Sequence, residues 1–357
     1  MTTRSRSQID RNLMSRKLSM MLLVSIGAAA LSCLVFPAAI ALSQDHSLSG
    51  SASAFQQAFE MINKPGITKV QYNYVMTGRV RLVLFWAGAD DVGGGYIRRA
   101  QSAADPKLRI TQVLFGSDPS KAPRKINHWG AATEAKAMGD SIFMGFMTSA
   151  NTSSAAKAEE DKKTQAERGQ YPFQAIMSVL DADRAVSRTI VLSANKNLNI
   201  HEYDEATRLV AERLKTGGPI RELAGNRRKC VESIGFLEAT DALINRVLSG
   251  SKAPQSVCYI HNARNYTLTL EEQSNLKGKT IHLRRKDGKE LDRNYRDLIR
   301  ASFSTFNHDS GERSTFELLL GNTGELRGVP VQIVHQPNWW FQVELNLESS
   351  PSGMKAN

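Results

Sequence analysis

The fold is decided by residues 298–347, LIRASFSTFNHDSGERSTFELLLGNTGELRGVPVQIVHQPNWWFQVELNL. Four short runs rich in branched and aromatic residues follow one another closely in this stretch: Leu298–Phe306, Thr315–Leu320, Val329–Val334 and Trp340–Leu347. Glycine, proline or aspartate lies between the runs, which is typical of strands separated by turns. No long helical pattern intervenes, so the spacing predicts antiparallel meanders.

Turn residues and further runs extend this pattern toward the N-terminus. Asp287-Gly288 and Asp309-Ser310-Gly311 suit the positive φ angles of hairpin turns. Five more runs predict strands: Val80–Trp86, Leu108–Phe115, Val186–Leu192, Val257–Ile260 and Tyr266–Leu270. The expected fold class is therefore α+β and β-rich, with antiparallel sheets arranged as a meander, a sandwich or a barrel-like structure.

Helices are expected at only a few places in the folded part. The apolar spacing in Ala54–Ile62 predicts a short helix. Asn199 and Glu202 form a capping-box pattern in front of a helical repeat that ends at Leu214, and Phe236–Leu248 predicts a second helix. These features divide the chain into a β-rich region at 44–198, with a polar loop or helix at 149–170, a helical connection at 199–250, and a C-terminal antiparallel β region at 251–357.

The N-terminus carries a targeting pattern over residues 1–43. Five basic residues and one acid precede an uncharged, largely apolar run from Leu18 to Ser43, and this run predicts a hydrophobic targeting helix. Ala39-Ile40-Ala41 and Ala41-Leu42-Ser43 are small-x-small cleavage sites, whereas the length of the run also suits a membrane anchor at residues 18–42. A signal peptide is favoured over an anchor, and both place Gln44 onward outside the cytoplasm, in the periplasm or secreted.

Charge narrows the choice of partners. The chain has a formal net charge of +11, and removal of residues 1–43 takes away five bases and one acid, which leaves 11 − 4 = +7. A basic exported protein is attracted to an anionic envelope polymer or a lipid surface. Nucleic acid is not expected, because no nucleic-acid-binding motif is present and the compartment is wrong.

Cysteine usage leaves one question open. Cys33 lies in the targeting segment, so the remaining chain holds Cys230 and Cys258. An even pair in an oxidising compartment can form a disulfide, and two buried free thiols are the alternative.

One short motif suggests catalysis. Gly139-Asp140-Ser141-Ile142, followed by Gly145, resembles the nucleophile block of the SGNH (GDSL-type) hydrolases. The resemblance covers this block alone and implies Ser141 as a nucleophile on the turn after a strand. That family also has an Asp-x-x-His pattern near the C-terminus, and no histidine in this chain has an aspartate three residues before it. Residues 134–138, which precede the block, are poor strand formers.

The loop-like stretch 89–96, ADDVGGGY, contains the only metal candidate. Asp90 and Asp91 could hold a hard cation such as calcium, whereas the three glycines favour a wide hairpin turn between a strand ending at Trp86 and one starting near Tyr96. The turn is the favoured interpretation, and no cofactor motif is present. The sequence therefore predicts an exported envelope protein that is non-catalytic and binds a ligand or partner, or has a structural role. The alternative is an extracytoplasmic hydrolase using Ser141.

Overall fold

The computed structural model describes residues 67–82, 85–102, 108–136, 142–149, 169, 171–214, 219–231, 234–251, 255–285, 287–338 and 341–349. The predicted targeting segment 1–43, the predicted helix Ala54–Ile62 and nearly all of the polar stretch 149–170 lie outside these residues. In the part of the chain that the structure describes, no helix has the length and apolar character needed to cross a membrane.

Strands make up most of the described chain. They are β1 (Ile67–Leu82), β2 (Phe85–Ser102), β3 (Arg109–Ser117), β4 (Trp129–Lys136), β5 (Ile142–Thr148), β6 (Tyr171–Leu180), β7 (Arg184–Ala194), β8 (Ile220–Ala224), β9 (Gln255–His261), β10 (Arg264–Arg284), β11 (Glu290–Asn307), β12 (Arg313–Gly321), β13 (Pro330–Asn338) and β14 (Phe341–Ser349). The two α-helices are α4 (Tyr203–Leu214) and α5 (Phe236–Leu248). Both helices were predicted, as was the capping box in which Asn199 and Glu202 begin the short 3-10 helix η2 (Ile200–Glu202).

All of these strands belong to one antiparallel sheet, in the order β8-β7-β6-β5-β4-β3-β2-β1-β14-β13-β12-β11-β10-β9. The predicted β-rich class with antiparallel meanders is confirmed at this level. The sequence suggested two sheet regions, the second beginning near Ser251. The structure instead joins them, because β1 pairs with β2 along one edge and with β14 along the other, where Val75 lies opposite Asn346.

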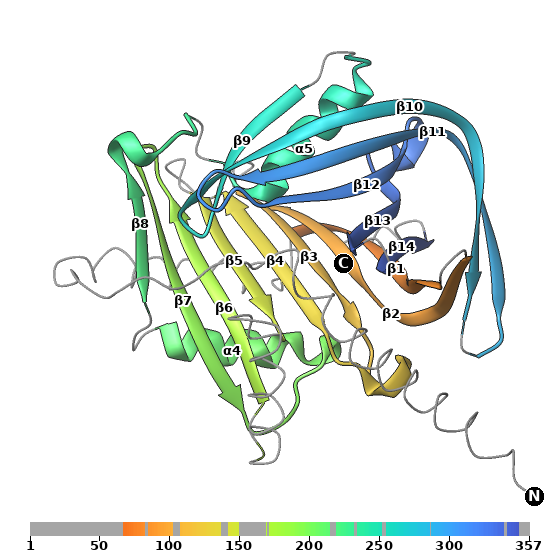
Figure 1. The fold of residues 1–357 in the computed structure, drawn as a ribbon, viewed down its shortest axis with the longest axis horizontal. Coiled ribbons are helices and arrows are strands. Elements are labelled where there is room, and N and C mark those ends of the chain that lie inside the picture. Colours follow the sequence, from red (N-terminus) through yellow and green to blue (C-terminus); the bar gives the residue numbers. More distant parts are fainter. Residues whose placement is uncertain are drawn as a thin grey trace, which may run out of the picture.

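The sheet curls until its two ends overlap (Figure 1). Successive side chains of β9 point to opposite faces. Tyr259 packs in the cluster that contains α5, whereas Ile260 packs with Leu180 of β6 and Leu223 of β8. The last strand of the sheet therefore lies against the concave face of β5–β8 at the other end.

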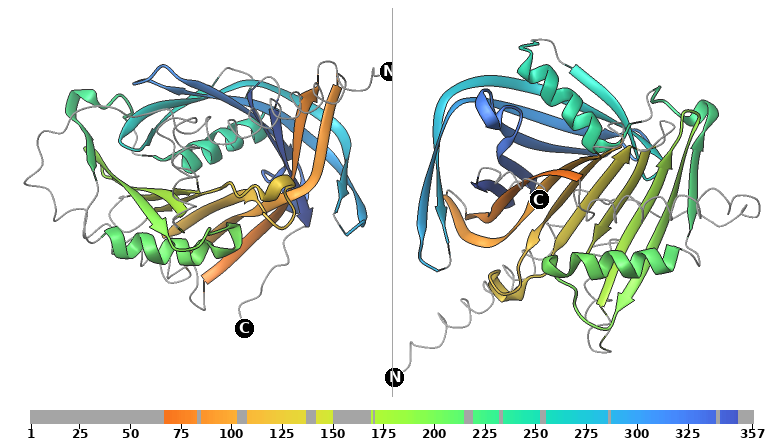
Figure 2. Two further views of the ribbon diagram at one scale, coloured as in Figure 1. Left: turned by 60° about the horizontal axis from the view of Figure 1, so that its bottom comes forward. Right: turned by 180° about the vertical axis from the view of Figure 1, so that it is seen from behind.

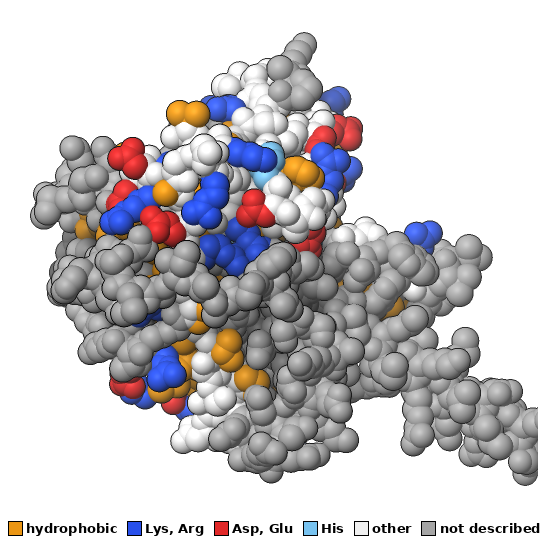
Figure 3. All heavy atoms as spheres, turned by 60° about the vertical axis from the view of Figure 1, so that its left-hand side comes forward, with side chains coloured by type: hydrophobic (Ala, Val, Ile, Leu, Met, Phe, Trp, Pro, Cys, Tyr) orange, Lys and Arg blue, Asp and Glu red, His pale blue; other side chains and the backbone are white. Residues whose placement is uncertain are grey.

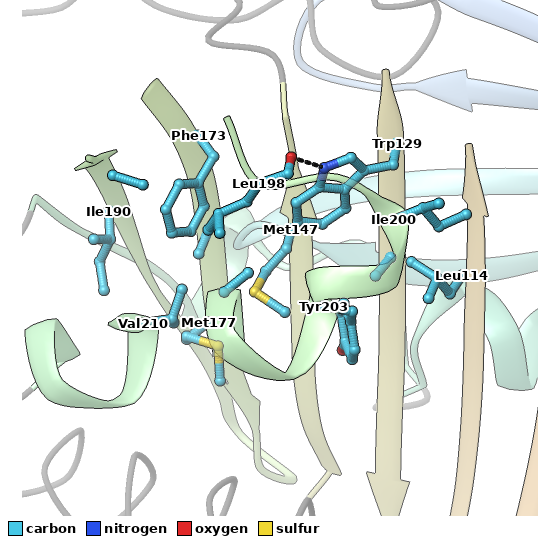
Figure 4. Close-up of a cluster of buried hydrophobic side chains, with 14 residues drawn as sticks. Leu114, Trp129, Met147, Phe173, Met177, Ile190, Leu198, Ile200, Tyr203 and Val210 are labelled. Carbon is cyan, nitrogen blue, oxygen red and sulfur yellow. Dashed lines mark hydrogen bonds between the residues drawn. The ribbon is translucent and has the colours of Figure 1, made fainter. Parts of the chain in front are cut away.

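The two helices occupy opposite faces of the sheet (Figure 2). On β4, the Thr133 hydroxyl lies 3.5 Å from the Tyr203 hydroxyl of α4, and the next residue, Glu134, accepts hydrogen bonds from α5. Helix α5 lies inside the curl and packs against β9–β12, whereas α4 covers the convex face. Figure 4 shows the α4 cluster, in which the Trp129 indole donates to the carbonyl of Leu198 at 2.9 Å.

Two local predictions in the first hairpin are wrong. The run Val80–Trp86 is the end of a hairpin and not one strand, since Leu82 pairs with Phe85. The predicted turn at 89–96 lies within β2, where glycine allows close approach of neighbouring groups. Gly95 lies between Tyr74 and Phe115, whose rings meet edge to face with centroids 5.5 Å apart, and a Cβ on Gly95 would collide with the Leu114 carbonyl and the Phe115 ring.

We expect Gly95→Ala to lower the free energy of unfolding by about 1–3 kcal/mol, because the added methyl group must displace backbone as well as a ring. Gly88→Ala on the same strand is the control, since a Cβ there meets its nearest neighbours at 3.7 and 3.8 Å. Urea unfolding measures both variants. Equal stability of the two would contradict the packing described for Gly95.

Candidate functional site

Ser141 cannot be placed, because it lies outside the described residues. In the sequence, Ser141 directly precedes Ile142, the first residue of β5. The expectation that 134–138 would not form a strand is wrong for Glu134–Lys136. In these residues Ala135 is fully buried and packs with Ile110, which gives the strand a tertiary contact that propensity does not include.

The carboxylates of Asp90 and Asp91 are engaged separately. The Thr77 hydroxyl donates to Asp90 at 3.2 Å, and the Lys121 ammonium forms an ion pair with Asp91 at 2.9 Å. The Asp91 side chain is only 6% exposed. The two carboxylates therefore contact different groups, at a point where the β1–β2 register shifts and Asp91 has a φ of 48°. The described residues contain no group of three or more metal-binding side chains.

Cys230 and Cys258 are joined by a disulfide whose Cα atoms are 5.2 Å apart. The bond lies within the overlap of the two sheet ends, in the cluster formed by Ile260, Leu223 and their neighbours. It therefore links the chain just after β8 to β9, the two edge strands of the sheet. In the chain-entropy model, closing a loop of this length stabilises the fold by about 3 to 4 kcal/mol.

Asn265 holds the same segment in place through its side chain and backbone. Its Oδ1 accepts from Lys229 N at 2.8 Å, its Nδ2 donates to the Arg227 carbonyl at 2.9 Å, and its own carbonyl accepts from His308 N at 3.0 Å. Asn265 is 1% exposed, so these bonds are desolvated. The segment before Cys230 is thus positioned on β10 independently of the disulfide.

Glu134 fixes the start of α5 inside the curl. Its Oε1 accepts from Leu237 N at 2.8 Å and its Oε2 from Glu238 N at 2.9 Å, which satisfies two free N–H groups of the helix. The N-cap residue Gly235 has no side chain to do this. Burial raises the pKa of Glu134 to about 7, although the two backbone hydrogen bonds act in the opposite direction.

Two ion pairs attach α5 to the concave face of β2 and β4. Arg99 of β2 contacts Asp241 at 2.6 Å, and Lys136 of β4 lies 3.9 Å from Glu238. The helix is therefore bound to β2–β4 through polar groups and to β9–β12 through apolar ones. These contacts hold the helix in position.

Ser120, Asp118 and His201 lie together but do not form a catalytic triad. The Ser120 hydroxyl donates to Asp118 Oδ1 at 2.6 Å, and His201 Nε2 lies 3.1 Å from Asp118 Oδ2. The aspartate thus stands between the serine and the histidine, whereas in a catalytic triad the histidine contacts the serine. The pKa of Asp118 is lowered to about 2 because its bonds to Ser120 and His201 outweigh the effect of burial. This group ties η2 to the loop after β3.

His261 lies at the inner end of β9 between two aromatic rings. Its ring centroid is 5.8 Å from that of Phe146 and 6.1 Å from that of Tyr266. Burial lowers the pKa of His261 to about 4, so the ring is neutral at physiological pH. It contributes to packing between the two overlapping ends.

Sequence reasoning missed the two polar residues that organise the overlap, Glu134 and Asn265. A glutamate in a run of small residues and an asparagine at the start of a strand are ordinary surface patterns. No local signal identifies either one, because their partners lie far away in the chain. The overlap is built to hold its parts together, and Glu134 and Asn265 are used for that purpose.

We expect the double variant Cys230→Ala/Cys258→Ala to lose about 3 to 4 kcal/mol of unfolding free energy. A reducing agent should destabilise the unmodified protein by a similar amount and leave the variant unchanged. Chemical unfolding with and without reductant measures both effects. Identical stability of the variant and the oxidised protein would contradict a stabilising link between the sheet ends.

Stability should also fall as pH rises through the range in which Glu134 ionises. Its folded pKa of about 7 lies above the usual 4.5, so this group's contribution is present at low pH and is lost as pH rises through 7. We expect a decrease of about 3 kcal/mol in unfolding free energy between about pH 5 and pH 8.

Glu134→Gln should flatten this pH dependence, although the amide satisfies only one of the two helix N–H groups and lowers stability at every pH. Glu212→Gln on α4, whose side chain is 59% exposed, is the control and should keep the slope. An unchanged slope in Glu134→Gln would show that another group titrates in this range.

Comparison with known proteins gives a distant structural likeness. No protein-family model matches the chain, and no curated protein matches it. Among solved structures, the chain is similar to the crystal structure of a β-barrel-like protein from Brucella abortus, a domain of unknown function named DUF1849. The match covers 80% of this chain and 98% of that chain, at 10% sequence identity and a TM-score of 0.34. At this level of similarity, the fold and the site rest on the geometry above.

Proposed function

We propose that the chain is an exported, non-catalytic, β-rich protein of the cell envelope that binds a ligand or partner or has a structural role. The observation that carries the proposal is the Cys230–Cys258 disulfide in the overlap of the sheet ends. Structural disulfides persist in oxidising compartments and are rare in the cytoplasm. The basic and apolar segment at residues 1–43 is a second, independent reason to expect export.

The non-catalytic role is supported by how the described polar side chains are used. Glu134 caps a helix, Asp91 pairs with Lys121, and Asp118 separates Ser120 from His201. Each of these side chains makes a contact that holds two elements together. Among the described residues, none of these sets joins a nucleophile to a general base.

An anionic envelope polymer or a lipid surface is the partner class that the charge favours. The chain from Gln44 onward carries a formal charge of +7, from 11 − 4. Attraction of this kind raises the rate of encounter with polyanions and with anionic headgroups, and it weakens as salt screens the charges.

The N-terminus of the protein, measured by mass spectrometry on fractions of its native host, tests the proposal. We expect a chain beginning near Leu42 or Gln44 in the soluble extracytoplasmic fraction, or an intact Met1 in the membrane fraction. In both cases Cys230 and Cys258 should resist alkylation until a reductant is added. An intact chain in the cytoplasm with two free thiols would overturn the proposal.

Ser141 provides the test of the hydrolase alternative. The proposal predicts that the protein does not hydrolyse simple esters above the background rate, and that Ser141→Ala leaves this unchanged. Turnover that is present in the unmodified protein and lost in Ser141→Ala would establish the hydrolase and contradict the non-catalytic role.

A further inference from the structure

Two cations lie side by side on the convex face of β1 and β2. Gln71 of β1 and Arg98 of β2 are register partners, and Arg98 Nε donates to Gln71 Oε1 at 2.9 Å. Lys69 lies two residues from Gln71 on the same strand, so its side chain points to the same face. Diagonal neighbours of this kind are within reach of long side chains.

The Arg98 guanidinium is held in one orientation by a chain of contacts. It lies 4.6 Å over the ring of Tyr96, whose hydroxyl donates to Gln112 Oε1 at 3.0 Å. Gln112, which is 1% exposed, donates in turn to the Tyr203 hydroxyl of α4 at 3.2 Å. The guanidinium therefore stacks on the Tyr96 ring, which is hydrogen-bonded to buried residues of the convex face.

The recognition groups of Arg98 are left unused by this arrangement. Its Nε bonds Gln71 and its flat face covers Tyr96, whereas no hydrogen bond from the described residues engages its two terminal nitrogens. Those nitrogens form the edge of the guanidinium fork that matches a carboxylate or a phosphate.

Among the residues that the structure describes, no carboxylate forms an ion pair with Lys69 or Arg98. Burial lowers the pKa of Lys69, and the positive charge of Arg98 lowers it further, with no acidic group acting against them. By contrast, Arg99, the next residue along β2, pairs with Asp241 on the concave side. On the β8 side of the molecule, acidic side chains lie among the gathered lysines and arginines (Figure 3). Two adjacent cations without a counter-ion repel each other, and a bound anion removes that cost.

We propose that Lys69 and Arg98 form a binding site for a phosphate or carboxylate group. Arg98 supplies the oriented fork and Lys69 a mobile point charge beside it. The inference deepens the proposed binding function, because anionic lipid headgroups and anionic envelope polymers both carry such groups.

Inorganic phosphate, titrated by calorimetry into the full chain at constant ionic strength, is the first probe. We expect binding that weakens about tenfold in Arg98→Gln, and by a smaller factor in Lys69→Gln, since each variant removes a charged donor. Arg98→Lys should fall between the unmodified protein and Arg98→Gln, because it keeps the charge and loses the fork. Thermal unfolding checks that the variants remain folded.

Arg81→Gln is the matched control. Arg81 lies on β1, the strand of Lys69, is exposed, and loses the same single charge on substitution. Phosphate affinity in this variant should equal that of the unmodified protein. If Arg81→Gln and Arg98→Gln weaken phosphate binding equally, the effect comes from net charge alone and the proposed site is wrong. Unchanged phosphate affinity in Arg98→Gln would also overturn the site.

Two further binding experiments identify which kind of molecule carries the phosphate or carboxylate group. Vesicles of phosphatidylcholine with and without phosphatidylglycerol test a lipid headgroup, and soluble polyglutamate tests a polymer. A loss of vesicle retention in Arg98→Gln but not in Arg81→Gln assigns the site to lipid, and the same pattern with polyglutamate assigns it to a polymer. Retention that is equal in all variants on both probes would overturn the assignment. Phosphate binding by a chain that stays in the cytoplasm would refute export and leave this site intact.

Discussion

The structure depends on the packing of β9 against the concave face at the opposite end of its own sheet. Ile260 is fully buried there among Leu180, Leu223 and Met144, while Tyr259 on the other face of the same strand packs beside α5. At Tyr259 and Ile260 both faces of an edge strand are thus removed from water, which is the hydrophobic gain that keeps the sheet curled. Without this contact, one side of α5 would be uncovered. Cys230 and Cys258 would also not be brought close enough to form a disulfide.

The overlap also solves the problem that a long sheet has two open edges. Unpaired edge strands are templates for aggregation. At one end, β9 is covered by the segment after β8, where Ile260 N donates to the Ile234 carbonyl at 2.9 Å. At the other end, β8 spans only Ile220–Ala224. The Cys230–Cys258 bond and Asn265 then hold the two ends in register. These links restrict the relative motion of the two ends, which suits a binding surface such as the one proposed at Lys69 and Arg98 on the convex side.

The sequence predicted what depends on local pattern and missed what depends on distant contacts. The strands between Leu298 and Leu347 and both helices could be recognised because side-chain periodicity is local. The pairing of β1 with β14 could not, since an apolar strand does not specify its neighbour. Glu134 gave no signal because its role as a cap depends on α5, far away in the chain. The glycines at 93–95 were misjudged as a turn because glycine serves a turn and a close strand contact equally well.

Hydrogen exchange of the β9 backbone amides in the oxidised protein is the most direct test of this account. An ordinary edge strand exchanges through local fraying, whereas a strand buried on both faces exchanges only with a large-scale opening. The account predicts that the amides of Val257, Tyr259 and Ile260 are protected nearly as well as those at the centre of β10 and β11. Rapid exchange along β9 while the disulfide is intact would contradict the overlap of the sheet ends.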